Sequence, residues 1–222
     1  MNWARGAAAI LAKDLKSELR GRAALNAVVL FAVVTLTAVS YSIGGYGITA
    51  EIQASLLWIV LFFAAMAGLS RSFVVEAEKG TQTALRLTAT GAQVYLGKFA
   101  FNLLLLLVLD AVVLALFQIL LPITTADWPL LVLGLLLGSA GLAASSTLIA
   151  AIVAQAGVKG ALFTVLAFPI LVPVLIAGIG ATRKALAMDG LQSAGSEIQL
   201  LVSYTGIMIT MALLLFDHIW KD

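Results

Sequence analysis

Long apolar runs alternate with short polar segments along the whole 222-residue chain. A run of about 20 apolar residues is long enough to cross the hydrocarbon core of a membrane as a helix. We predict six such spans, over residues 23–43, 52–69, 99–121, 128–153, 161–180 and 198–216. The expected fold class is therefore an all-α integral membrane protein with six transmembrane helices, in a single domain over residues 1–222.

Residues 1–22, ahead of the first run, have the pattern of an amphipathic helix. Apolar residues recur every four positions along one slowly turning stripe; they are Trp3, Ala7, Leu11, Leu15 and Leu19. Basic residues lie close together on the other side: Arg5, Lys13, Lys16 and Arg20. This pattern is typical of a helix lying at a membrane surface, and we predict a cytoplasmic interfacial helix. A partner-binding helix, or a charged N-terminus that only sets orientation, would share the pattern.

Composition and charge agree with a membrane location. Only 11% of the residues are charged and 62% are apolar, whereas a soluble domain has roughly 25% charged residues. All but two of the 13 lysines and arginines fall on the side of the predicted spans that carries the N-terminus. Because these residues are retained preferentially in the cytoplasm, we predict that both termini are cytoplasmic.

Motifs for catalysis are missing from the sequence. The chain has no cysteine, which excludes disulfides and thiolate metal sites. It also has no Gly-x-x-x-x-Gly-Lys-Ser/Thr segment to bind ATP phosphates and no His-Glu-x-x-His. We therefore predict no catalytic residues, no metal site and no enzyme activity, and an intramembrane enzyme is disfavoured.

Three polar residues lie inside the third predicted span at a spacing of eight: Asn102, Asp110 and Gln118. That spacing predicts that all three share roughly one helix face. An ionisable residue at this depth is costly and usually faces the bundle interior or a cavity. Two interpretations remain open: part of a conduit or conformational switch, or polar contacts that hold helices together.

The fourth and fifth predicted spans contain residues that shape helix packing. Gly134 and Gly138 form a Gly-x-x-x-Gly pair, which permits close helix approach, and we predict a structural role for it. Pro169 and Pro173, one turn apart, predict a kink or an interruption of the fifth span. Such a break is a candidate hinge, although prolines in transmembrane helices are often static.

The longest polar stretch, residues 71–98, connects the second and third predicted spans on the cytoplasmic side. It is too charged to face lipid and too short to form a domain. Within it, residues 81–89 predict a short amphipathic helix across the cytoplasmic face, where a soluble partner would dock. The alternative is a solvated connection.

Two segments of the sequence resemble the CcmB family, the membrane subunits of the ABC-type transporter of bacterial cytochrome c maturation. Residues 56–98 combine an aromatic-bearing span, Arg-x-Phe, an acidic patch with glycine and a closing Gly-Lys. Residues 134–177 combine the small-residue span, a turn at 157–160 and the sequence FPILVPVLIA. The order and spacing of these motifs carry the resemblance, and chain length and topology fit it along the whole chain.

The resemblance implies an ABC-2-type permease that forms its pathway as a homodimer in the bacterial inner membrane. It implies a CcmA-type ATPase subunit as a partner, together with CcmC, CcmD and the haem chaperone CcmE. Five residues of the 71–98 loop would belong to the element facing the ATPase: Arg71, Phe73, Glu76, Glu78 and Gly80. The family often has proline within the stretch 87–90, which has none here, so we expect that element to differ in shape.

The resemblance also implies how the complex uses haem and ATP. ATP would bind to the partner subunit, haem would be a candidate cargo of the complex, and this chain would bind no cofactor directly. Its four tryptophans are scattered along the sequence and form no cluster that would hold haem. We therefore expect a role in energy transduction that helps release the haem-loaded chaperone, with direct haem export as the alternative. An ABC-2 permease for a lipid, polysaccharide or drug, and a non-transporting membrane scaffold, are the competing functions.

Overall fold

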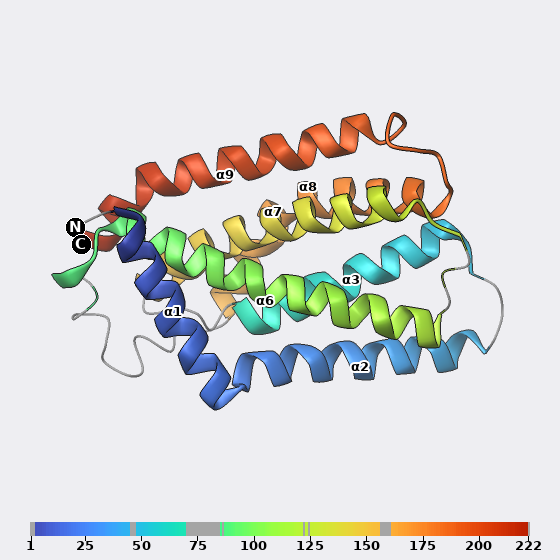
Figure 1. Ribbon diagram of the computed structural model, residues 1–222, viewed down its shortest axis with the longest axis horizontal. Helices are drawn as coiled ribbons and strands as arrows, with labels where there is room; N and C mark the ends of the chain where they lie inside the picture. The colour runs from blue at the N-terminus through green and yellow to red at the C-terminus, as the bar shows by residue number, and fades with distance from the viewer. Residues whose placement is uncertain are drawn as a thin grey trace.

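The structure is a computed structural model that describes residues 3–44, 48–69, 85, 87–121, 123, 125–155 and 161–221, without the side chains of 23, 24, 67, 68, 155, 161–165 and 217–221. Within these residues the chain forms the helices α1 (Trp3–Gly21), α2 (Ala23–Ile43), α3 (Ala50–Leu69), α6 (Gly91–Leu120), α7 (Trp128–Gln155), α8 (Ala161–Leu186) and α9 (Gly195–Lys221). The helices from α2 to α9 run lengthwise in an elongated bundle, and α1 lies across one end of it (Figure 1). The end of α9 lies at the same end as α1 (Figure 1).

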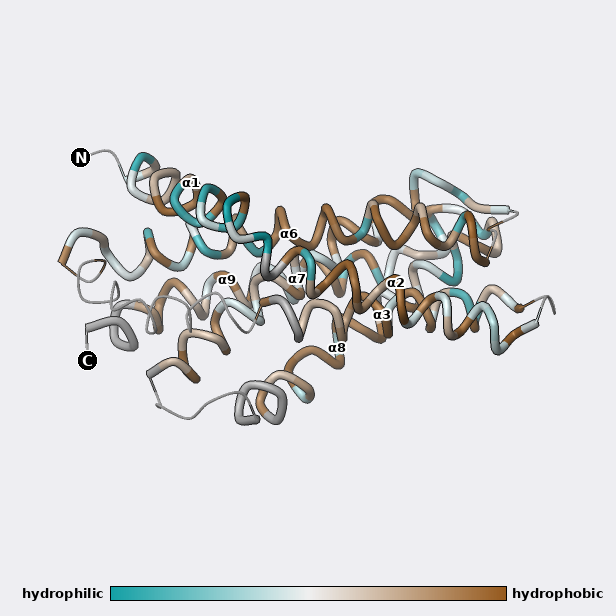
Figure 2. The backbone as a smooth tube through the Cα atoms, turned by 90° about the horizontal axis from the view of Figure 1, so that it is seen from below, coloured by the Kyte–Doolittle hydropathy of each residue, from teal (hydrophilic) through white to brown (hydrophobic). Residues whose placement is uncertain are grey.

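Five of these helices, α2, α6, α7, α8 and α9, are long and apolar enough to cross a membrane. The second predicted span corresponds to α3, whose described side chains form an apolar stretch over Ala50–Met66, directly before residues 67 and 68. Where six spans were predicted, the described part of the chain thus contains five that meet the criteria of length and composition. Figure 2 shows polar residues concentrated in α1 and towards the ends of the bundle, with apolar residues along the helices between them.

The helix boundaries follow the prediction at α2 and depart from it at α6 and α8. Helix α2 covers the residues 23–43 that were predicted. Helix α6 begins at Gly91 rather than at residue 99, because Thr90 and Gln93 form a capping box. The Thr90 hydroxyl accepts from the Gln93 amide at 3.4 Å, and the Gln93 side chain accepts from the Thr90 amide at 3.1 Å. Helix α8 continues to Leu186, so the connection between the fifth and sixth predicted spans, expected over residues 181–197, shrinks to residues 187–194.

Helix α8 contains both Pro169 and Pro173 and continues through them without a break. Of the kink or interruption predicted at these prolines, the interruption is therefore wrong, and the kink stays a prediction. A proline removes one backbone hydrogen bond, but contacts with neighbouring helices let a transmembrane helix tolerate that loss. Helix α8 packs against α3, α7 and α9, and a hinge at the two prolines stays a prediction.

Helix α7 is the central helix of the bundle. In its apolar stretch 78% of the residues are buried, against 17% in α2 and α9. The indole of Trp58 on α3 is fully buried and lies against Gly138 of α7 and Gly178 of α8. A Cβ atom added to these glycines would lie 2.0 Å and 2.4 Å from the indole. The predicted packing role of the glycine pair is thus confirmed at Gly138, whereas Gly134 makes only an ordinary contact.

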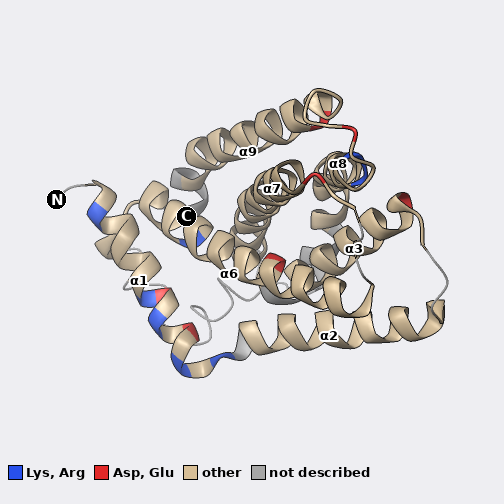
Figure 3. Cartoon of the chain, turned by 45° about the vertical axis from the view of Figure 1, so that its right-hand side comes forward, with Lys and Arg blue, Asp and Glu red and all other residues tan. Residues whose placement is uncertain are grey.

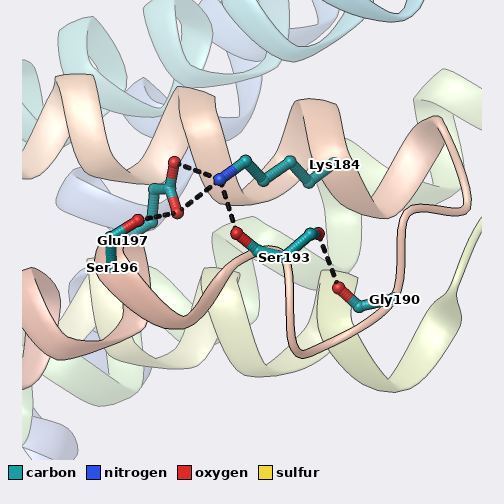
Figure 4. Close-up of polar contacts among 5 residues, drawn as sticks. All are labelled: Lys184, Gly190, Ser193, Ser196 and Glu197. Atoms are coloured by element: carbon teal, nitrogen blue, oxygen red, sulfur yellow. Dashed lines mark hydrogen bonds and ion pairs between the residues drawn. The ribbon is translucent and has the colours of Figure 1, made fainter.

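At the end of the bundle opposite α1, an ion pair joins α8 to α9 (Figure 4). The Lys184 Nζ atom lies 2.7 Å and 2.8 Å from the two carboxylate oxygens of Glu197 and donates to the Ser193 carbonyl at 2.7 Å. Ser196 donates to the same carboxylate at 2.9 Å. These contacts fix the short connection between the two helices.

Candidate functional site

Two hydrogen bonds between buried polar side chains cross the interface of α6 and α7. Asn102 Nδ2 donates to Thr147 Oγ1 at 2.8 Å, and Ser139 Oγ donates to Asp110 Oδ2 at 2.7 Å. The two residues on α6 are eight apart, and so are their two partners on α7. Eight residues of helix rise by about 12 Å. The helices are antiparallel, so one register forms both bonds, and we call these four residues the polar seam.

The polar seam leaves two acceptor atoms without a partner. Among the side chains that the structure describes, Asn102 Oδ1 and Asp110 Oδ1 are buried and receive no hydrogen bond. The hydroxyl of Ser146, beside the seam on α7, is likewise buried and has no hydrogen-bond partner among the described residues. A buried unsatisfied polar group costs about 1–3 kcal/mol. Groups that are retained at this cost inside a membrane bundle are candidates for a functional role.

Both interpretations of the buried carboxyl fit this geometry. Asp110 is only 6% exposed, so it faces the interior of the bundle and not lipid. Its bond to Ser139 joins two helices, as interhelical polar contacts do. Its free oxygen has the capacity to take a proton, a water molecule or a new donor when neighbouring helices shift, as a conformational switch requires.

Gln118 does not belong to the polar seam. It is exposed on α6, whereas Asn102 and Asp110 are buried. The reason is helix geometry: residues turn by about 100° each, so a step of eight leaves about 80° and two steps leave about 160°. The expectation that all three residues share one face is therefore wrong for Gln118.

Two further hydrogen bonds run in series from α7 through Tyr204 of α9 to α8. The Tyr204 hydroxyl donates to the Ile170 carbonyl at 2.6 Å, and Ser145 donates to the Tyr204 oxygen at 2.9 Å. On α6, Tyr95 donates to the Ala144 carbonyl at 3.2 Å. Central helix α7 thus has polar contacts to α6 and α9, and Tyr204 extends the second of these to α8, close to the Asn102 end of the seam.

Helix α1 is fixed to the first turns of α6 by close backbone approach. A Cβ atom at Gly97 would lie 2.7 Å from the Ile10 side chain, and one at Gly6 would lie 2.6 Å from the side-chain amide nitrogen of Gln93. No bulkier residue fits at either position without moving a neighbour. The helix that crosses the end of the bundle is therefore in direct contact with the helix that carries Asn102 and Asp110.

An ion pair with a buried lysine lies at the same crossing. Lys98 of α6 is 1% exposed, and its Nζ atom lies 3.1 Å from Asp14 Oδ2 of α1. Lys98 precedes Asn102 by one helical turn. Among the described residues, α1 thus connects to the polar seam through one continuous stretch of α6.

The predicted ATPase-facing residues lie outside the described residues. This applies to Arg71, Phe73, Glu76, Glu78 and Gly80. Of the predicted helix over 81–89, the structure describes Leu85 and 87–89, and Ala89 donates to the Leu85 carbonyl at 3.1 Å, as in a helical turn. Within the described part of the chain, no group of three His, Cys, Asp or Glu residues has a geometry suited to a metal ion.

Sequence reasoning missed three of the contacts that organise this region. Trp58 donates to Thr182 at 2.8 Å across 124 residues of sequence, and no local pattern announces this pairing. The Lys98–Asp14 pair and the Thr147 partner of Asn102 were missed as well. Lys98 carried a usable signal, because it is a charged residue directly beside an apolar run.

Spans of membrane length, a polar seam in their interior and an amphipathic helix across one end define a multi-pass integral membrane protein of the all-α class. The chain matches the CcmB protein family over residues 5–218, which is nearly its whole length, and it belongs to that family.

Two curated relatives agree with this assignment. The chain is 29% identical over 184 residues to "Heme exporter protein B" of Paracoccus denitrificans, covering 81% of this chain and 83% of the relative. It is 28% identical over 178 residues to the protein of the same name in Rhodobacter capsulatus, covering 79% of this chain and 82% of the relative. The family resemblance seen in residues 56–98 and 134–177 is thus confirmed.

Proposed function

We propose that this chain is the non-catalytic membrane permease subunit of an ABC transporter for cytochrome c maturation. A separate CcmA-type subunit hydrolyses ATP, and the chain converts that hydrolysis into a conformational change in the membrane. Its role is to help release the haem-loaded chaperone CcmE, beside CcmC and CcmD. The observation that carries this proposal is membership of the CcmB family across residues 5–218.

The proposed architecture is an ABC-2-type permease with six transmembrane helices, of which α3 is the second, acting as a homodimer. Two observations support an even number of spans. Helix α3 runs lengthwise in the bundle with the five longer helices, and α1 and the end of α9 lie at the same end (Figure 1). The distribution of lysine and arginine supports cytoplasmic termini in a bacterial inner membrane.

Energy transfer is proposed to begin at the 71–98 loop and to reach the spans through α6. The proposed ATPase-facing residues are Arg71, Phe73, Glu76, Glu78 and Gly80. The packed crossing of α1 and α6 supports this route, because it links the end of the bundle to the polar seam. ATP-driven closure of the partner would favour one of two helix arrangements.

Deletion of the gene in its source, followed by a stain of membrane proteins for covalently bound haem, tests the proposal. Loss of every c-type cytochrome signal, restored by this chain, is the expected result. An unchanged signal would overturn the assignment and leave a permease for another cargo. If an ATPase-dead partner leaves the restored signal intact, the chain is a scaffold and does not transduce energy.

Variants of the complementing gene test the residues. Glu76→Lys with Glu78→Lys should abolish complementation, whereas Thr81→Ala with Thr83→Ala, in the same loop, should preserve it.

In the spans, Asp110→Asn keeps an acceptor for Ser139 but removes the ionisable group. Gln118→Leu, on the exposed face of the same helix, is its matched control. Loss of function in Asp110→Asn at normal protein level favours a switch, and full function favours interhelical packing.

A further inference from the structure

The orientation of α1 about its own axis is fixed by contacts on one side and at one end. Gly6 and Ile10 face α6, as does Asp14 through its pair with Lys98. At the other end, Glu18 Oε1 accepts from the Leu25 amide of α2 at 2.8 Å. Between the two helices Arg22 has φ 52°, in the left-handed region, which ends α1 and turns the chain into α2. The remaining faces of α1 therefore have defined directions.

Two faces of α1 are left exposed by this packing, and they differ in chemistry. One is apolar, with Leu15 39% and Leu19 63% exposed. The adjoining face is basic and carries Lys16 and Arg20, both exposed. Figure 3 shows lysine and arginine gathered along α1 and at its corner with α2, with only scattered charge along the bundle.

The basic face of α1 is hollowed into an open groove of about 500 Å³, lined by Lys13, Lys16, Ser17, Arg20 and Gly21. Lys13 lies 3.2 Å from Asp14 and so has a carboxylate neighbour. Among the described residues, neither Lys16 nor Arg20 takes part in an ion pair. The groove therefore offers two cations for which this part of the chain supplies no anion.

The start of α2 indicates the level at which the groove lies relative to the membrane. The apolar stretch of α2 begins at Leu25, directly after the corner at Arg22. A span that starts there leaves the hydrocarbon layer at the level of α1, where lipid headgroups lie. The apolar face with Leu15 and Leu19 fits the acyl boundary, and the adjoining cations fit the phosphate layer.

We propose that the groove on α1 binds the headgroup of an anionic phospholipid. Lys16 and Arg20 contact the phosphate, and Leu15 and Leu19 pack against the first part of the acyl chains. Anionic rather than zwitterionic lipid is expected, because the groove offers two cations and, among the described residues that line it, none is acidic. This inference does not depend on the cargo of the transporter.

Lipid retention measures this site directly. The full chain is reconstituted in nanodiscs with equal amounts of phosphatidylglycerol and phosphatidylcholine, extracted in mild detergent and analysed by native mass spectrometry for bound lipid. The variants are Lys16→Gln with Arg20→Gln, Lys16→Gln alone, the charge-preserving Lys16→Arg with Arg20→Lys, and the control Arg183→Gln. The control removes one charge, as Lys16→Gln does, from an exposed residue in the last turn of α8 and not from α1.

The wild type, the charge-preserving variant and the Arg183→Gln control are expected to retain phosphatidylglycerol in preference to phosphatidylcholine. Removing both groove cations should lower that preference about 30-fold, at about five-fold per charge near an anionic surface. Lys16→Gln alone should lower it about five-fold, which keeps the test usable if the double variant does not fold. Equal retention of both lipids by the wild type overturns the proposal, and so does a loss of preference in Arg183→Gln equal to that in Lys16→Gln.

Discussion

The substitution Gly138→Ala is the sharpest test of the packing around α7. The added methyl carbon would lie 2.0 Å from the Trp58 ring, whereas carbon atoms pack at about 3.5–4.0 Å. The indole would have to move by at least about 1.5 Å to restore that separation. Movement towards α8 is blocked because the ring already lies against Gly178, where a Cβ atom would be 2.4 Å away. Movement out of this plane breaks the 2.8 Å bond to Thr182.

The expected cost combines two effects. Overpacking a core costs about 1–3 kcal/mol, and the lost hydrogen bond adds about 0.5–1.5 kcal/mol. We expect Gly138→Ala to lower the free energy of unfolding by about 2–4 kcal/mol. The control Gly206→Ala lies on α9 in open space and should be neutral or stabilising by up to about 1 kcal/mol, from helix propensity alone.

Unfolding in mixed micelles of increasing sodium dodecyl sulfate content, followed by far-ultraviolet circular dichroism, gives these free energies without relying on tryptophan fluorescence. A double-mutant cycle with Trp58→Leu isolates the clash. In the Trp58→Leu background, Gly138→Ala should cost little, because the smaller side chain leaves room for the methyl group. The packing argument is refuted if Gly138→Ala is as harmless as Gly206→Ala, or if its cost is the same in both backgrounds.

Three further changes test the seam and the two ends of the bundle. Thr147→Val should lower the free energy of unfolding by about 1–3 kcal/mol, because it removes the partner of Asn102. Adding Asn102→Leu should recover part of that loss. An equal loss in the single and the double variant would contradict a hydrogen-bonded pair. Asp14→Asn should weaken the contact with Lys98 and raise hydrogen exchange in α1 while leaving α7 unchanged, and an unaltered α1 would show that the ion pair does not hold it. Glu197→Gln should lower the free energy of unfolding by only about 0.2–1 kcal/mol, as loss of a partly exposed ion pair does, and should speed hydrogen exchange in the α8–α9 connection. A loss above about 2 kcal/mol, or unchanged hydrogen exchange in that connection, would contradict this.

The extent of the membrane helices could be predicted from the sequence because apolar length alone specifies a span. The residues of α2 were predicted as observed, since glycine and charged residues end its apolar run. The start of α6 was missed because the helix continues into polar sequence, where the capping box of Thr90 and Gln93 decides the boundary. Hydropathy is insensitive to that kind of local hydrogen bond.

The interior polar residues could be found from the sequence, but their partners could not. Asp110 stands out in an apolar run, whereas Ser139 is one of several small polar residues on α7. Which of them pairs with Asp110 depends on the register between two helices, and register is a property of the packed bundle. The error at Gln118 had a different origin, because a drift of about 80° per eight residues accumulates along a helix.

The equal spacing of the polar seam has a consequence for movement between α6 and α7. If the two helices slid past each other by one turn in either direction, Asn102 would face Ala143 or Ala151, and Asp110 would face Leu135 or Ala143. Neither position offers a hydrogen-bond partner, so both bonds would be lost together. Intermediate positions are no better, because packed side chains allow only discrete arrangements. Only one register between α6 and α7 therefore forms both hydrogen bonds. This helix pair either moves as one rigid body or separates in an all-or-none step.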